Sequence, residues 1–329
     1  MAAARAIEEV LERAGADRFQ ISVFSEESCP SYDRLRVASV MSGALAVDHI
    51  FHRTRGWYKR HGVRVHWGEQ AVVVSRRTRV VYGSAGSEER YDTLVFATGS
   101  SPHIPPIKNL FRPDGTRVPG VCEFRTLADC VRIMALLNGA RRVAIMGGGL
   151  LGLEASRGLA PHRCRLDLLH RGDRLLSDGL DDAAALLLLQ RVREMGIQVH
   201  LKRSVSALAG NERVTGLVLD DGSVMPCDLV VVATGLIPNT WLAYQCGLTV
   251  ERGIAVDAQM RCLEDRSIYA LGECAQPRGK TFGLAAAIRQ QAKLLAEHLT
   301  GGAPSTGLAS TTKRERHAND RARPIELAR

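Results

Sequence analysis

The chain has 329 residues, of which 45% are hydrophobic and 5% aromatic, so it can bury a large aliphatic core, and its length suggests two domains. Its formal net charge at pH 7 is +9. Because no zinc-finger, helix-turn-helix or RNA-binding signature accompanies this charge, we interpret it as a solvated basic surface rather than a nucleic-acid interface. Such a surface suits an acidic protein partner or an anionic nucleotide.

Eight cysteines are spread along the chain, and none stands in a C-x-x-C or C-x-x-x-x-C spacing. This pattern argues against a structural zinc, an iron–sulfur cluster held by the chain or a redox disulfide, so we expect no metal site. The N-terminus carries Glu8, Glu9 and Glu12 without the apolar stretch of a signal peptide, and the longest purely apolar run, residues 183–189, is far too short for a membrane span. With the scattered cysteines, these features predict a cytoplasmic protein.

The N-terminal part of the chain predicts two helices and a series of short strands. One helix covers Ala2–Ala14 and ends at Gly15, and another covers residues 54–61. The short strands are predicted at residues 19–24, 63–67, 71–75, 78–82 and 91–97. Residues 100–119 hold five prolines and are predicted to form a crossover linker.

The middle of the chain alternates helices with strands. Helices are predicted at Leu127–Leu137, 150–160 and Asp182–Glu194, and strands at Arg142–Met146, 165–169 and Ile197–Leu201. Because helices separate these strands, we predict a parallel sheet with crossover connections. A strand meander follows, from residues 214–219 to Leu229–Val232, and we expect an antiparallel insertion there.

The most informative motif is Gly147-Gly-Gly149-Leu-Leu-Gly152, which joins a predicted strand to a predicted helix. Gly147 would make the tight turn, Gly149 would let the backbone approach a phosphate, and Gly152 would let the helix pack on the strand. The free N–H groups of the helix N-terminus would then face the anion. The motif therefore predicts a site for the pyrophosphate of a dinucleotide.

The sequence repeats itself. Residues 61–66 resemble residues 195–200, and residues 91–102, with Ala97-Thr98-Gly99, match residues 227–238, with Ala233-Thr234-Gly235. Two copies of one nucleotide-binding architecture are implied. The strand and glycine turn of the second copy have no counterpart before Ala2, so we expect the first copy to lack its phosphate motif and its central strand. We hypothesise that Met1 is an internal start.

Together with this repeat, several phrases carry a family resemblance. They are Val23-Phe-Ser-Glu26, Pro30-Ser-Tyr32-Asp-Arg34, Phe124-Arg125-Thr, Leu168-Leu-His170 and Gly272-Glu273-Cys-Ala275. Over about residues 1–300 the chain resembles the FAD-dependent pyridine nucleotide-disulfide oxidoreductases. In closer detail it resembles the N-terminal flavin module of the NAD(P)H-dependent assimilatory nitrite reductase large subunit.

The resemblance implies an α/β fold of two Rossmann-like units with parallel sheets and antiparallel β-meander insertions. The FAD-binding domain would comprise residues 1–118 and 241–300, and the NAD(P)H-binding domain residues 119–240. Residues 301–329, rich in arginine and poor in apolar side chains, are expected to form a disordered basic tail.

The resemblance also implies which residues hold FAD. Glu26 would accept hydrogen bonds from the adenosine ribose, the alternative being an exposed loop acid. The turn Ala97-Thr98-Gly99 would let backbone approach FAD, unless it is an ordinary turn. In the Gly272-Glu273 phrase, Glu273 would bind a ribityl hydroxyl and Ala275 would begin the approach to the flavin ring. A helix at residues 284–299 would direct its dipole at that ring. Arg34 and Arg125 would face the flavin or its pyrophosphate, or else are surface arginines.

On the nicotinamide side, Gly235 ends the Ala-Thr-Gly turn of the second copy of the repeat, as Gly99 ends that of the first. Glu154 would lie near the nicotinamide, or form a salt bridge on its own helix. His170 and Arg171 stand where an NAD-specific site usually has an acid, and they can pair with a 2′-phosphate. This favours NADPH, although a histidine there also fits NADH users in this branch.

Cys29 invites comparison with single-cysteine peroxidases and coenzyme A disulfide reductases, which share this fold. In those proteins the reactive cysteine begins a helix further along the chain, near the position of Val37–Met41. This chain has no cysteine at that position. We therefore interpret Cys29 as a plain thiol and Cys274 as a packing residue.

The implied activity is hydride transfer from NAD(P)H to FAD, followed by release of electrons to a separate acceptor. The acceptor would be an iron–sulfur and sirohaem module or a small electron carrier. The cofactors supply the chemistry, so no side chain is predicted as catalytic. Two alternatives stay open: a ferredoxin or rubredoxin reductase, and an inactive fragment that binds a dinucleotide only at Gly147–Gly152. Without the first phosphate motif, we expect weak FAD binding.

Overall fold

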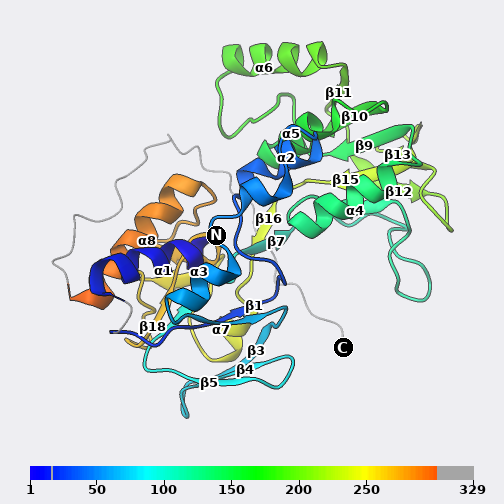
Figure 1. Cartoon of the computed structure of the whole chain (residues 1–329). Helices are drawn as coiled ribbons and strands as arrows, with labels where there is room; N and C mark the ends of the chain where they lie inside the picture. Colours follow the sequence, from blue (N-terminus) through cyan, green and yellow to red (C-terminus); the bar gives the residue numbers. More distant parts are fainter. Residues whose placement is uncertain (16–17, 302–329) are drawn as a thin grey trace.

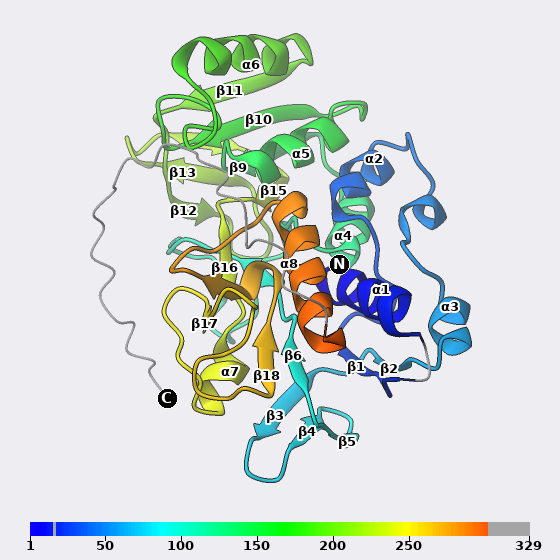
Figure 2. The same cartoon turned by 90° about the vertical axis from the view of Figure 1, so that its left-hand side faces the viewer.

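The computed structural model describes residues 1–15 and 18–301. Two α/β units lie next to each other, joined where β7 (Ser100–Pro102) and β16 (Leu236–Pro238) meet (Figures 1 and 2). This arrangement confirms the predicted fold class. The predicted tail, residues 301–329, lies outside the described residues except for Gly301. Within the described ranges, no helix combines the length and apolar character needed to cross a lipid bilayer.

The first unit begins with helix α1 and continues through short strands. Its elements in chain order are α1 (Ala2–Ala14), β1 (Ser22–Ser25), α2 (Val37–Met41), α3 (Arg55–Arg60), β2 (Arg64–Trp67), β3 (Ala71–Ser75), β4 (Val80–Gly83), β5 (Glu88–Arg90), β6 (Leu94–Phe96) and β7 (Ser100–Pro102). Two single turns of 3₁₀ helix, Arg34–Arg36 and Val47–Ile50, flank α2. The chain returns to this unit after the second one, through α7 (Trp241–Gln245), β17 (Ile254–Val256), β18 (Ile268–Ala270), the 3₁₀ turn Gly272–Cys274, β19 (Ala275–Pro277) and α8 (Ala285–Thr300).

The second unit contains the remaining elements. They are β8 (Val121–Glu123), α4 (Leu127–Leu137), β9 (Arg142–Met146), α5 (Leu150–Leu159), β10 (Arg165–His170), α6 (Asp182–Glu194), β11 (Ile197–Leu201), β12 (Val205–Ala209), β13 (Gly216–Leu219), β14 (Val224–Pro226), β15 (Leu229–Val232) and β16 (Leu236–Pro238). Five of the strands form a parallel sheet in the order β11-β10-β9-β15-β8.

Both faces of this parallel sheet are covered, as its unbroken hydrophobic strands require. On β9, Val143 and Ile145 pack in one cluster with α2, α4 and α5. Ala144 and Met146 face the other way, into a cluster with the antiparallel sheet β12-β13-β14. The predicted meander therefore needs one correction: β15 belongs to the parallel sheet, and all four of its residues are buried.

The parallel strands of the first unit form three separate pairs, β2 with β1, β18 with β6 and β17 with β19. In the second unit β9 lies between β10 and β15, whereas among the described strands none joins β1 to β6. An antiparallel sheet, β3-β4-β5, is inserted after β2, and α1 packs along α8 (Figures 1 and 2).

A segment of the first unit crosses to the second. Helix α2 lies against α5 and α4, and its Val37, Ala38 and Met41 are buried in the core of the second unit. Gly158 on α5 allows this close approach, because a Cβ there would stand 3.0 Å from the backbone carbonyl oxygen of Ala38. No helix was predicted for this segment, since its five residues are too few to show a helical period.

The two Ala-Thr-Gly turns of the repeat meet in space by a reciprocal set of hydrogen bonds. Thr98 donates its hydroxyl proton to the carbonyl of Asn239 at 2.6 Å, and Thr234 donates to the carbonyl of His103 at 2.6 Å. The backbone N–H of Asn239 donates to Gly99, and that of His103 donates to Gly235, each at 2.9 Å. β7 and β16 pair antiparallel between them. The sequence repeat is therefore also a local two-fold arrangement, which holds the two units together.

Candidate functional site

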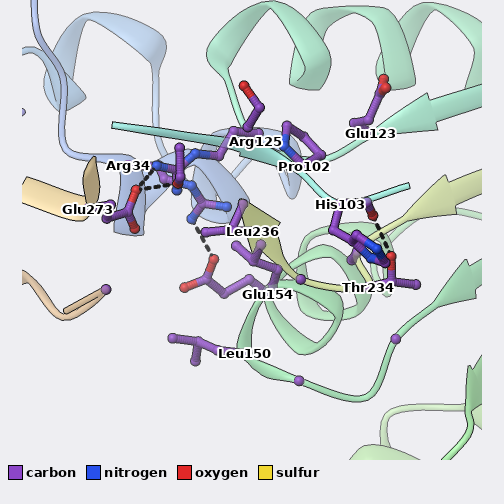
Figure 3. Close-up of a pocket in the computed structure, with 18 of the residues that line it drawn as sticks. Arg34, Pro102, His103, Glu123, Arg125, Leu150, Glu154, Thr234, Leu236 and Glu273 are labelled. Atoms are coloured by element: carbon purple, nitrogen blue, oxygen red, sulfur yellow. Dashed lines mark hydrogen bonds and ion pairs between the residues drawn. The ribbon is translucent and has the colours of Figure 1, made fainter. Parts of the chain in front are cut away.

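A cleft of about 1430 Å³ lies between the two units and is lined by residues of both (Figure 3). The structure brings most of the predicted site residues to its lining. They are Glu26, Arg34, Ala97, Thr98, Gly99, Arg125, Gly147, Gly149, Glu154, His170, Arg171, Gly235 and Glu273. Gly152, Gly272 and Ala275 are buried outside the lining. Both Ala-Thr-Gly turns of the repeat, residues 97–99 and 233–235, lie on this lining.

The glycine turn after β9 has the geometry of a phosphate loop. Gly147 has a φ of +116°, and a Cβ there would stand 2.3 Å from the carbonyl oxygen of Ala233. A Cβ on Gly152 would stand 1.7 Å from the carbonyl oxygen of Gly147. A Cβ on Gly149 would meet no atom within 4 Å. The absence of a side chain at Gly147 and Gly152 thus lets the turn pack closely against α5 and the end of β15. The empty space beside Gly149, the N-cap residue of α5, leaves room for a phosphate.

His170, at the end of β10, supports the same turn. Its Nδ1 accepts a hydrogen bond from the backbone N–H of Gly148 at 3.2 Å, while its Nε2 is buried without a partner in the described residues. Burial lowers the pKa of His170, so the ring is neutral near pH 7 and can accept that hydrogen bond. Arg171 is exposed and lines the cleft next to it. The cationic side chain available to a nucleotide here is therefore Arg171 rather than His170.

Arg34 and Glu154 form an ion pair between the two units. Nη1 of Arg34 lies 2.7 Å from Oε2 of Glu154, and their side chains are 12% and 16% exposed. The guanidinium also lies over the ring of Phe124, with Cζ 5.4 Å from its centroid, and its Nε has no partner in the described residues. Glu154 thus forms a salt bridge across the cleft rather than along its own helix, and Arg34 is not a surface arginine.

Arg125 forms the second ion pair of the cleft, with Glu273, and both pairs are marked in Figure 3. Ser100 also donates its hydroxyl proton to Glu273, at 2.7 Å. These contacts join the start of the second unit to the loop after β18, in which Glu273 was predicted to bind a ribityl hydroxyl. Because Arg125 and Ser100 both donate to it, the carboxylate of Glu273 is held in position. Its remaining lone pairs can accept hydrogen bonds from a ligand.

Beside the α1 end of the cleft, and outside its lining, lies a buried polar group that the sequence did not predict. Gln291 on α8 is fully buried, and its Oε1 accepts a hydrogen bond from the N–H of Gly272 at 2.7 Å. Its Nε2 has no partner in the described part of the chain. Gly272 has a φ of +84°, and a Cβ there would stand 2.9 Å from the Cβ of Ala2. A glutamine at a buried position of an apolar helix face is the signal that could have found this site.

Glu26 lies directly after β1, exposed and on the cleft lining, as predicted for a ribose-binding carboxylate. Its neighbour Glu27 also lines the cleft and accepts a hydrogen bond from the hydroxyl of Tyr32 at 2.7 Å. Glu27 is therefore engaged within the protein, whereas Glu26 has no hydrogen bond or ion pair among the described residues. Ala275, by contrast, is buried in β19 and is not on the lining.

The glycine turn and the two Ala-Thr-Gly turns on one cleft agree with the family that the sequence resembles. The model of the pyridine nucleotide-disulphide oxidoreductases matches residues 1–292. The chain belongs to this family.

Two proteins of Bacillus subtilis illustrate its place among the pyridine nucleotide-disulphide oxidoreductases. The chain is 37% identical over 301 residues to a nitrite reductase [NAD(P)H], and 36% identical over 301 residues to an assimilatory nitrate reductase electron transfer subunit. Each match covers 92% of this chain, but only 36% and 38% of those proteins. Among solved structures, a ferredoxin reductase from Rhodopseudomonas palustris superimposes with a TM-score of 0.82 at 25% identity, covering 92% of this chain and 76% of that one. The predicted family is therefore confirmed.

The cysteines of this family member are placed for packing rather than for disulfide exchange. Those in the described residues are all free, and none lines the cleft. Burial raises the pKa of Cys122 and Cys130 to about 11 and of Cys227 and Cys262 to about 12, so these thiols stay protonated at neutral pH. Burial also raises the pKa of Cys29 and of Cys274. Because the thiolate is the reactive form, the cleft offers no thiol nucleophile.

Proposed function

We propose that this chain is a flavin-dependent NAD(P)H oxidoreductase that delivers electrons to a separate acceptor, as in the flavin module of a nitrite reductase. The proposal rests on one observation: the glycine turn of the second unit and the Glu26, Glu273 and α1 end of the first unit open into the same cleft. Family membership confirms an oxidoreductase and supports FAD and a nicotinamide dinucleotide as its cofactors. Their residence in this cleft, and each residue's role, are part of the proposal.

The residues present fit NAD(P)H at its pyrophosphate and FAD at its adenosine ribose and ribityl chain. The open backbone at Gly149 and the N-terminus of α5 would bind the pyrophosphate of NAD(P)H. Glu26 would accept the ribose hydroxyls of FAD, and Glu273, fixed by Arg125 and Ser100, would accept from its ribityl chain. When bound, FAD takes a hydride from the nicotinamide and returns electrons one at a time.

Arg34 and Glu154 would position the nicotinamide rather than react with it. Their ion pair joins the two units on the cleft lining, so it would help to hold the two proposed dinucleotide sites at a constant distance. Correct positioning of two reactants supplies much of the rate of a bimolecular step. We assign no proton-transfer role to either side chain.

Arg171 favours NADPH over NADH. It is exposed at the end of β10, where the adenosine ribose of a dinucleotide lies in this fold, and His170 beside it is neutral. A guanidinium there can pair with a 2′-phosphate.

We propose a separate protein or domain as the acceptor, because the chain is similar to an assimilatory nitrate reductase electron transfer subunit. Its similarity to a nitrite reductase [NAD(P)H] leads us to propose an iron–sulfur and sirohaem module for this role. Location in the cytoplasm is likewise a proposal, which rests on the cysteine pattern.

The decisive experiment is reconstitution of the purified chain with FAD. We expect bound flavin, measured by its absorbance, to be reduced by NADPH and reoxidised by the neutral acceptor menadione. A chain that binds NADPH but neither retains FAD nor reduces menadione would instead be the inactive dinucleotide-binding fragment.

A second candidate, a ferredoxin or rubredoxin reductase, is favoured by the similarity to the R. palustris ferredoxin reductase. Rapid NADPH-dependent reduction of an isolated iron–sulfur carrier would select it. Reduction only of a covalently or tightly associated sirohaem module would select the nitrite reductase role.

A further inference from the structure

Helix α6 exposes leucine side chains that no other described element covers. Leu186 is 67% exposed and Leu187 is 65% exposed, whereas Ala185 and Val192, on the other side of the helix, are buried. Both views show α6 as the outermost helix of the second unit (Figures 1 and 2). An amphipathic helix normally turns charged and polar residues to solvent, so neighbouring exposed leucines on α6 indicate a binding surface.

Four residues form a line along the exposed side of this helix. We name them the α6 stripe: Asp182, Leu186, Leu189 and Arg193. Their spacings of four, three and four residues keep them within one narrow arc of the helix surface. Leu186, Leu189 and Arg193 also line a shallow hollow of about 470 Å³. The stripe therefore has an apolar centre and a charged residue at each end.

The charges at the two ends of the α6 stripe are opposite. Asp182, in the first turn of α6, pairs with Arg174, but its side chain is still 82% exposed. Arg193, in the last turn, is exposed and has no carboxylate partner within the described ranges. Glu194 does not compete for it, because Nη1 of Arg191 already lies 2.8 Å from Oε2 of Glu194. Both end charges are therefore accessible to a partner.

We propose that the α6 stripe is a self-association surface, on which a second copy of this chain docks through its own α6 in the antiparallel direction. The spacing of the stripe is the same when it is read from either end. A two-fold axis midway between Leu186 and Leu189 therefore brings each of these leucines against the other one of the second copy, and Asp182 against Arg193. A parallel pair would instead place like charges side by side, so charge complementarity selects the antiparallel dimer.

The surface is small, so we expect the dimer to be weak. The 13 residues of α6 span about 20 Å, which places the contact at the low end of specific interfaces and its Kd in the micromolar range. All residues of α6 are described, and none of them lines the cleft. The inference is therefore independent of the proposed function, and it involves neither FAD nor NAD(P)H.

Sedimentation equilibrium of the purified full chain, over a range of micromolar concentrations, tests the proposal. We expect a monomer–dimer equilibrium, and Leu186→Glu should raise its Kd about tenfold or more, because a carboxylate then lies at the centre of the contact. The matched control is Leu263→Glu on the first unit, where Leu263 is 64% exposed; its Kd should stay within about twofold. Both leucines are exposed, so thermal unfolding should show that both variants keep the native fold.

An exchange of charges tests the antiparallel direction. Asp182→Lys and Arg193→Glu should each raise the Kd by about fivefold or more, because each places like charges together at both ends of the contact. The double variant, Asp182→Lys/Arg193→Glu, restores opposite charges and should bind more tightly than Asp182→Lys alone. The pair with Arg174 is lost in both of these variants, so it cancels in the comparison.

Three results would overturn the self-association surface: a chain that stays monomeric throughout the range, a dimer that Leu186→Glu leaves intact, or an equal loss of dimer in Leu263→Glu. A double charge variant that binds no more tightly than Asp182→Lys would overturn the antiparallel pairing. Sedimentation needs no cofactor, so none of these results depends on whether the chain retains FAD or reduces menadione.

Discussion

Nη1 of Arg34 and Oε2 of Glu154 lie 2.7 Å apart, although the residues are 120 positions apart in the chain and belong to different units. The pair is mostly shielded from water, so its electrostatic interaction is weakly screened. It lies on the lining of the cleft together with the Arg125–Glu273 pair, so the geometry of the site depends on contacts between the units.

Arg34→Ala is expected to destabilise the protein by about 1–3 kcal/mol, because it leaves the carboxylate of Glu154 poorly solvated and unpaired. Urea unfolding measures this change. Arg36→Ala is the matched control: Arg36 is 58% exposed and pairs with Asp33 at the surface, so its loss should cost less than about 0.5 kcal/mol. Equal losses for the two variants would contradict the role of the cleft pair.

Two glycine substitutions in the phosphate turn should have different effects. Gly152→Ala places a methyl group against the carbonyl of Gly147 and is expected to cost about 2–3 kcal/mol or more of stability. The methyl group of Gly149→Ala would meet no neighbouring atom, so the melting temperature of this variant should be unchanged. Its Kd for NADPH should rise about tenfold, because the methyl group occupies the space through which the phosphate approaches the backbone. A Gly149→Ala variant that binds NADPH normally would remove Gly149 from the proposed site.

The stability of the protein should depend on the protonation of His170. Burial lowers its pKa in the folded state, so below its ordinary value of about 6.5 the unfolded chain binds a proton that the folded chain does not. Stability is therefore full above pH 6.5 and falls as the pH drops toward the lowered pKa. The half-buried His52, whose pKa is also lowered by burial, adds a change of the same sign.

The contribution of His170 is isolated by His170→Gln, in which the side-chain oxygen can still accept from Gly148 but does not titrate. Denaturant unfolding at pH 7.5 and 5.5 should show a smaller loss of stability for this variant than for the unsubstituted chain. An identical loss in both proteins would show that His170 does not titrate in this range.

Arg171→Ala is expected to raise the KM for NADPH about tenfold or more and to leave the KM for NADH within about twofold, because a charged hydrogen bond to a 2′-phosphate is lost. Steady-state menadione reduction with each dinucleotide measures both constants. Arg193→Ala, at an exposed position of α6, is the control for removal of one positive charge. Equal changes for both dinucleotides would reject a 2′-phosphate contact.

Cys29→Ser should leave the rate of menadione reduction within about twofold, since the pKa of Cys29 is raised by burial and the residue lies outside the cleft lining. Loss of flavin reduction in this variant would revive the peroxidase or disulfide reductase alternative.

In the native protein, iodoacetamide at pH 7.5 should label Cys122, Cys130, Cys227 and Cys262 far more slowly than after unfolding, as mass spectrometry of the labelled peptides would show.

Local patterns predicted the elements whose sequence periodicity is strong. The bounds of α1, α4, β9, α6 and β11 agree with the predictions residue for residue. The predicted strand at residues 19–24 is shifted, since β1 covers Ser22–Ser25, and the helix at residues 54–61 is shorter, since Thr54 caps α3 from outside. Short strands such as β8 and β17 were not predicted, because three residues carry too little pattern to distinguish them from loop.

The sequence by itself determined the family, the repeat and the strand ends at which a dinucleotide could bind, because glycine turns and hydrophobic periods depend on neighbours close in the chain. Only the tertiary structure decided what the charged residues do. Arg125 and Glu273 are 148 positions apart, and which carboxylate each arginine pairs with depends on how the two units face each other. The same holds for α2, which belongs to the first unit in sequence and to the core of the second in space, because its apolar face is buried there against α5.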